Sequence, residues 1–257
     1  MKTIRTIEAV REELVPHRAG STVGLVPTLG ALHEGHESLF RAARSECDIV
    51  VASLFLNSAQ FEEGADLDSY PRDEQADSDL AAAAGVDLLF APTADEMYPA
   101  GFQTWVEVED LGRMLEGEHR PGHFRGVATI CLKLFNIVRP QLAYFGQKDA
   151  QQVAVLQRLV RDLDLEVSIR VLPTVRDADG LALSSRNVLL TPEQRRVALA
   201  LPRALSTKDL TAARAALDGL DVDYVEVAEF DPPVLAAAIR VGSVRLIDNV
   251  VLDKEPS

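Results

Sequence analysis

The sequence predicts an α/β fold, with a Rossmann-like, doubly wound and mostly parallel sheet followed by a second, smaller α+β C-terminal domain. Up to residue 172, short apolar or β-branched runs alternate with segments of helical periodicity, which is the pattern of repeated βαβ units. The run at 48–56 is almost continuously apolar, as expected of a central parallel strand. The alternation stops after Pro173. We therefore expect one domain at residues 1–174 and the smaller one at 175–257.

The composition is that of an ordinary globular protein. The 257 residues are 47% apolar and 26% charged, which argues against disorder. A formal net charge of −14 argues against a nucleic-acid surface, because phosphate backbones require a basic face. No apolar run approaches the length of a membrane span, so no membrane association is expected.

The first domain is expected to alternate strands and helices in chain order. The expected strands are residues 22–26, 48–56, 86–91, 104–108, 142–145 and 165–172. The expected helices are residues 3–17, 37–46, 77–84, 129–138 and 150–163. Polar or glycine-rich loops are expected at residues 62–72 and 112–126.

The second domain is expected to mix helices with two strands. Thr191 and Pro192, with Gln194 following, form the start signal of a helix. Pro202 is expected to kink or end that helix. Alternating runs at 223–229 and 243–252 are typical of strands, and the intervening segments are expected to be helical.

The stretch from Val26 to His36 follows the first long strand and precedes a helix. Such a strand–turn–helix junction is suited to phosphate, because free N–H groups and the helix dipole favour an anion there. His33 and His36 lie three residues apart and share one face of the first turn. Zinc hydrolases instead use an i, i+4 pair with an intervening Glu, so a zinc site is less favoured than a nucleotide site.

Three further stretches place polar groups where ligands bind. Asn57–Phe61 follows the carboxyl end of the strand at 48–56, the edge at which open α/β sheets bind ligands. Lys148 lies at a strand–loop–helix junction and is a candidate phosphate clamp. The Ser-rich turn at 179–187 is either a domain connection or a mobile loop that grips phosphates through hydroxyls and a guanidinium.

Several of these blocks, taken together, resemble one enzyme family. Pro-Thr-Leu-Gly-Ala-Leu-His-Glu-Gly-His at 27–36, Phe-Gly-Gln-Lys-Asp-Ala-Gln-Gln at 145–152 and Ser-Ser-Arg-Asn at 184–187 resemble the motifs of pantothenate synthetases. These enzymes are the pantoate–β-alanine ligases of the His-x-Gly-His nucleotidyltransferase superfamily. Leu29 and Leu183 stand where the family usually has Met, and Ser58 stands where it usually has Pro.

The resemblance implies an ATP-dependent ligase that forms pantoyl adenylate and then transfers the pantoyl group to β-alanine. The implied catalytic residues are His33, His36, Lys148, Ser184, Ser185 and Arg186. The implied ATP-binding residues are Leu29, Gly30, Ala31, Leu32, His33, Gly146, Gln147, Lys148, Asp149, Val175, Leu183, Ser184, Ser185 and Arg186. The implied substrate-binding residues are Gln60 and Gln152, with Asn57, Arg120 and His123 as further candidates.

The family also suggests Mg²⁺ as a cofactor, a homodimer and a cytoplasmic location. Asp77 or Asp149 would help to place the metal, and the resemblance favours Asp77. Cys47 and Cys131 lie in apolar surroundings without metal spacing, so we expect buried free thiols. Two alternatives stay open, namely a different adenylyltransferase and a nucleotide-binding regulator without catalytic activity.

Overall fold

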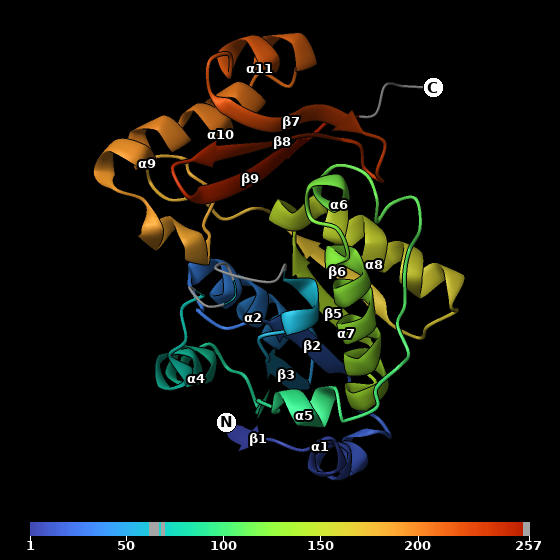
Figure 1. The fold of residues 1–257 in the computed structure, drawn as a ribbon. Helices are drawn as coiled ribbons and strands as arrows, with labels where there is room; N and C mark the ends of the chain where they lie inside the picture. Colours follow the sequence, from blue (N-terminus) through green and yellow to red (C-terminus); the bar gives the residue numbers. More distant parts are fainter. Residues whose placement is uncertain (62–66, 68–69, 254–257) are drawn as a thin grey trace. The chain divides into compact units, whose positions relative to one another are not determined.

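The structure, a computed structural model, describes most of the chain (Figure 1). The described residues are 1–61, 67 and 70–253. They form two compact units, which are described separately below. The N-terminal unit comprises Met1–Phe145 and Val155–Leu172, and the C-terminal unit comprises Gly146–Ala154 and Pro173–Ser257. The predicted functional division at residue 174 stays a prediction, and the segment around Lys148 groups with the C-terminal unit.

The N-terminal unit is built on a six-stranded sheet with the order β1-β4-β3-β2-β5-β6. The strands are β1 Lys2–Ile4, β2 Val23–Thr28, β3 Ile49–Leu54, β4 Leu88–Phe90, β5 Leu142–Gly146 and β6 Ser168–Leu172. β2 pairs in parallel with β3 and with β5, and β4 pairs in parallel with β3 and β1. The order of the strands reverses between β2 and β5, so the predicted doubly wound fold is confirmed.

Helices cover this sheet on both faces (Figure 1). The helices up to this point of the chain are α1 Ile7–Leu14, α2 Glu34–Glu46, α4 Glu74–Ala83, α5 Ala94–Met97, α6 Glu116–His119, α7 His123–Val138 and α8 Ala150–Asp162, with short 3₁₀ turns η1 Val15–His17, η2 Ser58–Gln60 and η3 Gln147–Asp149. η3 and the start of α8, up to Ala154, belong to the C-terminal unit. Phe40 and Ala43 of α2 and Ala81 of α4 pack with Val26 and Val50 of the sheet in one buried cluster. α7 contacts β2, α1 and η2 instead. Burial of these apolar side chains holds the helices against the sheet, and this fixes the loops that join them to the strand ends.

The C-terminal unit contains an antiparallel sheet with the order β7-β8-β9. Its elements are η4 Ser185–Leu189, α9 Pro192–Ala198, α10 Ala200–Leu205, α11 Leu210–Ala216, β7 Asp221–Ala228, β8 Val234–Val241 and β9 Val244–Val251. Leu201 and Leu205 of α10 and Leu217 after α11 share a buried cluster with Leu235 and Leu246 of the sheet. Figure 1 shows the three helices gathered on one side of these strands.

Several sequence predictions are corrected by the structure. β1 lies where a helix is predicted, and its three residues are too short to show a strand period. Residues 104–108, predicted as a strand, form no strand in the structure. α7 begins at His123, within the predicted loop at 112–126. β8 is alanine-rich, which is typical of a helix, yet it is the central strand of its sheet.

The helix that begins at Pro192 ends at Ala198, so the predicted break before Pro202 is confirmed. Pro202 lies in the first turn of the separate helix α10, where no intrahelical N–H bond is needed. The predicted loop at 62–72 lies largely outside the described residues. Cys47 and Cys131 are both buried and free, as predicted. None of the helices in the described part of the chain has both the length and the apolar character that a bilayer crossing requires.

Candidate active site

The two imidazoles at the start of α2 are locked by the backbone of the same turn. The N–H of Gly35 donates to His33 Nδ1 at 3.1 Å, and the N–H of His33 donates to His36 Nδ1 at 3.3 Å. The ring centroids are 4.2 Å apart. A ring nitrogen that accepts a hydrogen bond carries no proton, so both neutral rings hold their proton on Nε2. The pair is therefore preset as two Nε2–H donors.

A buried carboxylate holds the loop that precedes this pair. Asp77, on α4, is 5% exposed, and its two oxygens accept the N–H groups of Ala31 at 3.0 Å and Leu32 at 2.7 Å. Burial raises the pKa of Asp77, while those two N–H bonds act to lower it. Gly30 has a φ of +96°, and a Cβ there would lie 3.1 Å from Asp77 Oδ2. The loop is thus fixed from a helix 45 residues further along the chain.

These contacts correct one expectation about the anion site. The backbone N–H groups of Ala31, Leu32, His33 and Gly35 already donate within the protein. The N–H groups of His36 and Glu37 donate to the carbonyl of His33. The predicted set of free backbone donors is therefore wrong for these positions. The imidazole Nε2–H groups are the side-chain donors of this turn.

A second polar group lies beyond the end of β3. The hydroxyl of Tyr98 donates to Asn57 Oδ1 at 2.7 Å, and Asn57 Nδ2 donates to Gln60 Oε1 at 2.9 Å. The bond from Tyr98 identifies Oδ1 of the Asn57 amide, and the bond from Asn57 Nδ2 identifies Oε1 of the Gln60 amide. The remaining polar group of Gln60 is therefore its NH₂, which is a donor. Gly126 of α7 lies so close that a Cβ there would be 2.3 Å from the carbonyl oxygen of Ala59. This contact holds η2 against α7.

Arg120 and His123 meet at the carbonyl oxygen of Gln60. His123 Nδ1 lies 2.8 Å from that oxygen, and Arg120 Nη2 lies 3.4 Å from it. A carbonyl can only accept, so Nδ1 of His123 carries the proton, opposite to His33 and His36. Its Nε2 lies 3.5 Å from Arg120 Nη1. Three of the predicted substrate residues, together with Asn57, are thus brought into one cluster.

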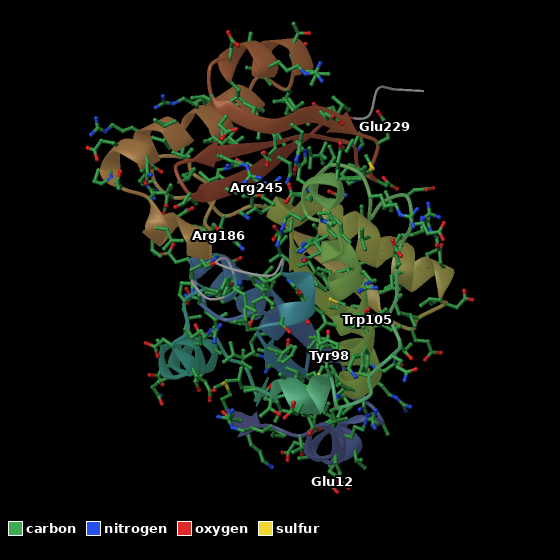
Figure 2. All side chains as sticks on the ribbon, viewed as in Figure 1. Glu12, Tyr98, Trp105, Arg186, Glu229 and Arg245 are labelled. Atoms are coloured by element: carbon green, nitrogen blue, oxygen red, sulfur yellow. The ribbon has the colours of Figure 1, made fainter. Side chains whose placement is uncertain are left out.

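An aromatic group packs beside this cluster. The ring of Tyr98 stacks on Trp105 with centroids 5.8 Å apart, and Phe102 meets both rings edge-on. Figure 2 shows Tyr98 and Trp105 in neighbouring positions. Burial raises the pKa of the Tyr98 phenol, so it stays protonated and donates to Asn57 at neutral pH. Sequence analysis missed this residue, and Met97-Tyr98-Pro99 gives no local signal for its contact 41 residues away.

In the C-terminal unit, the Lys148 segment is bound by β9. Asn249 Nδ2 donates to the carbonyl oxygens of Gln147 and Lys148, each at 2.9 Å, and Asn249 Oδ1 accepts from Gln147 Nε2 at 3.1 Å. Lys148 Nζ lies 3.5 Å from Asp149 Oδ1. Gln152 is half-buried in the first turn of α8. Sequence analysis assigned Asn249 no role.

The Ser-rich loop is organised by its own backbone. Ser184 caps η4, and its Oγ accepts the N–H of Arg186 at 3.3 Å. The N–H of Leu183 donates to the carbonyl of Val175 at 2.9 Å, which places these two predicted ATP-binding residues side by side. Figure 2 labels Arg186 in this loop. The loop therefore presents Ser184, Ser185 and Arg186 from one compact turn.

No three-residue metal cluster of His, Cys, Asp or Glu exists among the described residues. Magnesium needs fewer protein ligands than that, because it is often held by one or two carboxylates and the phosphates of a nucleotide. Both oxygens of Asp77 accept a backbone N–H bond, and each keeps a further lone pair, so its role in placing magnesium stays a prediction. Its geometry is that of a residue that holds a loop.

Comparison with known proteins gives consistent matches along the chain. The family described as Pantoate-beta-alanine ligase matches residues 2–251. The pantothenate synthetase of Moorella thermoacetica is 50% identical, with 98% of this chain and 99% of that protein covered. The one from Corynebacterium glutamicum is 49% identical, over 98% and 100%.

Solved structures match equally well. The pantothenate synthetase of Thermus thermophilus has a TM-score of 0.92 and 44% identity, with 98% of this chain and 99% of that chain covered. The pantoate-beta-alanine ligase of Francisella tularensis, in complex with beta-gamma ATP and beta-alanine, has a TM-score of 0.87 and 35% identity, over 98% and 97%.

Proposed function

Since the chain belongs to the pantoate–β-alanine ligase family and is an enzyme of that kind, we propose that it works through a pantoyl-adenylate intermediate. Pantoate and ATP would give pantoyl adenylate and pyrophosphate, and β-alanine would then displace AMP to give pantothenate. A carboxylate is a poor acyl donor, and adenylation supplies the leaving group. The observation that carries this proposal is the pair of imidazoles preset as Nε2–H donors after β2.

The His pair suits the first step. Attack of the pantoate carboxylate on the α-phosphorus is an in-line displacement, in which positioning and charge stabilisation supply most of the catalysis. His33 and His36 would donate their Nε2–H groups to phosphate oxygens. Their Nδ1 bonds prevent rotation of the rings, so no reorganisation is needed as charge develops.

The positive charge would come from the C-terminal unit. Lys148 follows β5, which pairs with β2 at the point where the strand order reverses, and α/β sheets bind ligands at such a point. We assign Lys148 to the phosphates of ATP. Ser184, Ser185 and Arg186 would hold the departing pyrophosphate through hydroxyls and a guanidinium.

The cluster around Gln60 would bind pantoate. The NH₂ of Gln60 and the amide of Gln152 would hold its hydroxyls and carboxylate, with Asn57, Arg120 and His123 setting the position of Gln60. Neutral amides suit this task, because a tight ion pair would reduce the nucleophilicity of the pantoate carboxylate. Arg120 and His123 meet the backbone oxygen of Gln60, which supports a positioning role for both.

The remaining assignments concern ATP. Leu29, Gly30, Ala31 and Leu32 would pack against the nucleotide from the loop before α2, while Val175 and Leu183 would contribute from the C-terminal unit, with Gly146, Gln147 and Asp149 beside Lys148. The role of Asp77 in placing magnesium stays a proposal, since each of its oxygens keeps a further lone pair beside its backbone bond.

An acyl adenylate must be kept from water until β-alanine arrives. We propose that residues 175–257 serve as a lid over the nucleotide- and pantoate-binding residues of 1–174. A homodimer and a cytoplasmic location are further proposals that rest on the family resemblance. Sedimentation of the purified enzyme tests the first of these.

One experiment tests the chemistry. Pyrophosphate release from ATP is measured with and without pantoate, before β-alanine is added. Release that requires pantoate supports the adenylate. ATP binding without any release would indicate a regulator, and a product that retains AMP would indicate a different adenylyltransferase.

A further inference from the structure

β9 carries two adjacent polar residues inside an otherwise apolar environment. Asp248 is 2% exposed and Asn249 is 4% exposed. Buried polar groups are destabilising unless they are hydrogen-bonded. Neither residue belongs to the predicted ligand-binding sets, so their burial requires another explanation.

Every polar atom of the Asn249 amide has a partner in the Lys148 segment. Its Nδ2 donates to the carbonyl oxygens of Gln147 and Lys148, each at 2.9 Å, and its Oδ1 accepts from Gln147 Nε2 at 3.1 Å. The carbonyls can only accept, so the orientation of the amide is fixed. These bonds span 101 and 102 residues of sequence.

Asp248 makes the corresponding connection to the chain before the Ser-rich loop. Its oxygens accept from Arg176 Nη1 at 2.6 Å and Nη2 at 3.0 Å, and its Oδ1 also accepts the N–H of Asn249 at 2.8 Å. Arg176 Nη1 reaches the carbonyl of Gly180 at 3.3 Å, and Arg176 forms a β-bridge with Ala182. The salt bridge therefore holds the chain that leads into Ser184.

We propose that Asn249 is a positioning residue for Lys148, and that Asp248 and Asn249 couple the Lys148 segment to the Ser184–Arg186 loop. This inference rests on the proposed role of Lys148 and of that loop in binding phosphates. With two backbone carbonyls of the segment bound by one amide, the Cα of Lys148 is held at a defined position. Small displacements of a charge from its target are costly in rate, so a residue that contacts no substrate controls adenylation.

The first test is Asn249→Ala. Pantoate-dependent ATP–pyrophosphate exchange should fall about tenfold or more, the KM for ATP should rise, and the KM for pantoate should stay unchanged. In a Lys148→Ala background the same substitution should lower the exchange rate by less than about twofold, because the effects of residues that act through one another are not additive. An additive loss, or an unchanged exchange rate, overturns the inference.

Asn249→Asp provides a second variant of the same shape. Its carboxylate keeps the acceptor for Gln147 Nε2 but faces the two carbonyl oxygens as a negative charge, so exchange should fall at least as far as in Asn249→Ala. Protonation would restore one donor, so the loss should shrink as pH is lowered, and the wild-type profile should lack this feature. A pH-independent loss in this variant counts against the inference.

Asp223→Asn is the matched control. Asp223 lies on β7 of the same sheet, and its ion pairs join Arg240 at 3.0 Å and Arg245 at 2.5 Å. We expect this variant to lower the melting temperature while exchange and both KM values stay within about twofold. If Asp223→Asn raises the KM for ATP as much as Asn249→Ala does, any damage to the sheet is sufficient to weaken ATP binding. That result would contradict a specific role for Asn249.

The single variant Lys148→Ala distinguishes a failure of the proposed function from a failure of the role inferred for Asn249. If it leaves exchange intact, the proposed function of Lys148 is wrong and the inference falls with it. If it abolishes exchange while Asn249→Ala does not change it, only the inference is wrong.

Discussion

In the N-terminal unit the loop before α2 is held by a carboxylate, whereas in the C-terminal unit the segment after β5 is held by an amide. Asp77 accepts two backbone N–H groups, and Asn249 donates to two backbone carbonyls. The first arrangement uses backbone donors within the protein, so in the proposed mechanism the donors to phosphate are the side chains of His33 and His36. The second binds the negative ends of two peptide dipoles, which would otherwise disfavour an anion beside Lys148. Four predictions sharpen the N-terminal side of this comparison, from the largest expected effect to the smallest.

The largest effect is expected for His36→Asn. The Asn side chain keeps an acceptor near the position of Nδ1 for the His33 N–H, but it lacks the Nε2–H donor. Pantoate-dependent ATP–pyrophosphate exchange should fall about a hundredfold, as for loss of one oxyanion-hole donor. His17→Ala, a change at a half-buried histidine far from this turn in sequence, should leave the rate unchanged. Retained exchange in His36→Asn would show that the cap bond, and not the donor, is what matters.

Asp77→Asn tests the carboxylate that holds the loop. One of the two backbone N–H groups would face an NH₂ group, and an unsatisfied buried donor costs about 1–3 kcal/mol. We expect urea unfolding to show that loss, together with slower exchange because His33 is less well positioned. A magnesium ligand would behave differently. Unchanged stability with a raised magnesium requirement would support the metal role of Asp77.

Tyr98→Phe should affect pantoate more than ATP. The phenol donates to Asn57 Oδ1, which in turn orients Gln60. Loss of one hydrogen bond of about 1 kcal/mol corresponds to a rise of roughly fivefold in the KM for pantoate, with the KM for ATP unchanged. Tyr144→Phe is the matched control, because that buried phenol contacts Cys47 Sγ at 3.3 Å. An equal rise in both KM values for Tyr98→Phe would argue for a general loss of packing.

The smallest effect concerns the thiols, which both lie in the N-terminal unit. Burial raises the pKa of Cys131 from its ordinary value of 9.0 to about 12. Below pH 9.0 the thiol is protonated in both the folded and the unfolded state. Above pH 9.0 only the unfolded state loses the proton, so the free energy of unfolding falls as pH rises toward about 12. The free energy of unfolding falls by at most about 1.4 kcal/mol per pH unit over this range.

Urea unfolding between about pH 8 and 10.5 measures this slope, and Cys131→Ala should reduce it. Alkylation of the two thiols of the wild type at about pH 8 should also be slow and should accelerate only with denaturant. Because both thiols lie in the N-terminal unit, this rate reports the opening of that unit alone. Rapid alkylation in the native state would contradict the burial of both thiols.

Local sequence patterns predict the candidate residues of the site, but they do not predict the residues that hold those candidates in place. The His33–His36 junction and the Asn57–Phe61 turn are local patterns, visible in strand, turn and helix signals within about ten residues. The start of α7 is predicted as loop because residues 112–126 are rich in Gly, His and Arg and contain Pro121. Gly126 is required instead by the close approach of η2.

By itself, the sequence determined the order of most strands and helices, the parallel sheet and the candidate residues, because hydrophobic periodicity and turn chemistry are local. Only the tertiary structure decided which side chains hold those residues in place. Asp77 reaches back 46 residues to Ala31, Tyr98 reaches 41 to Asn57, and Asn249 reaches 102 to Gln147. No local pattern encodes such pairs. They exist because packing brings distant strand ends together, where a buried polar atom is destabilising unless it finds a partner.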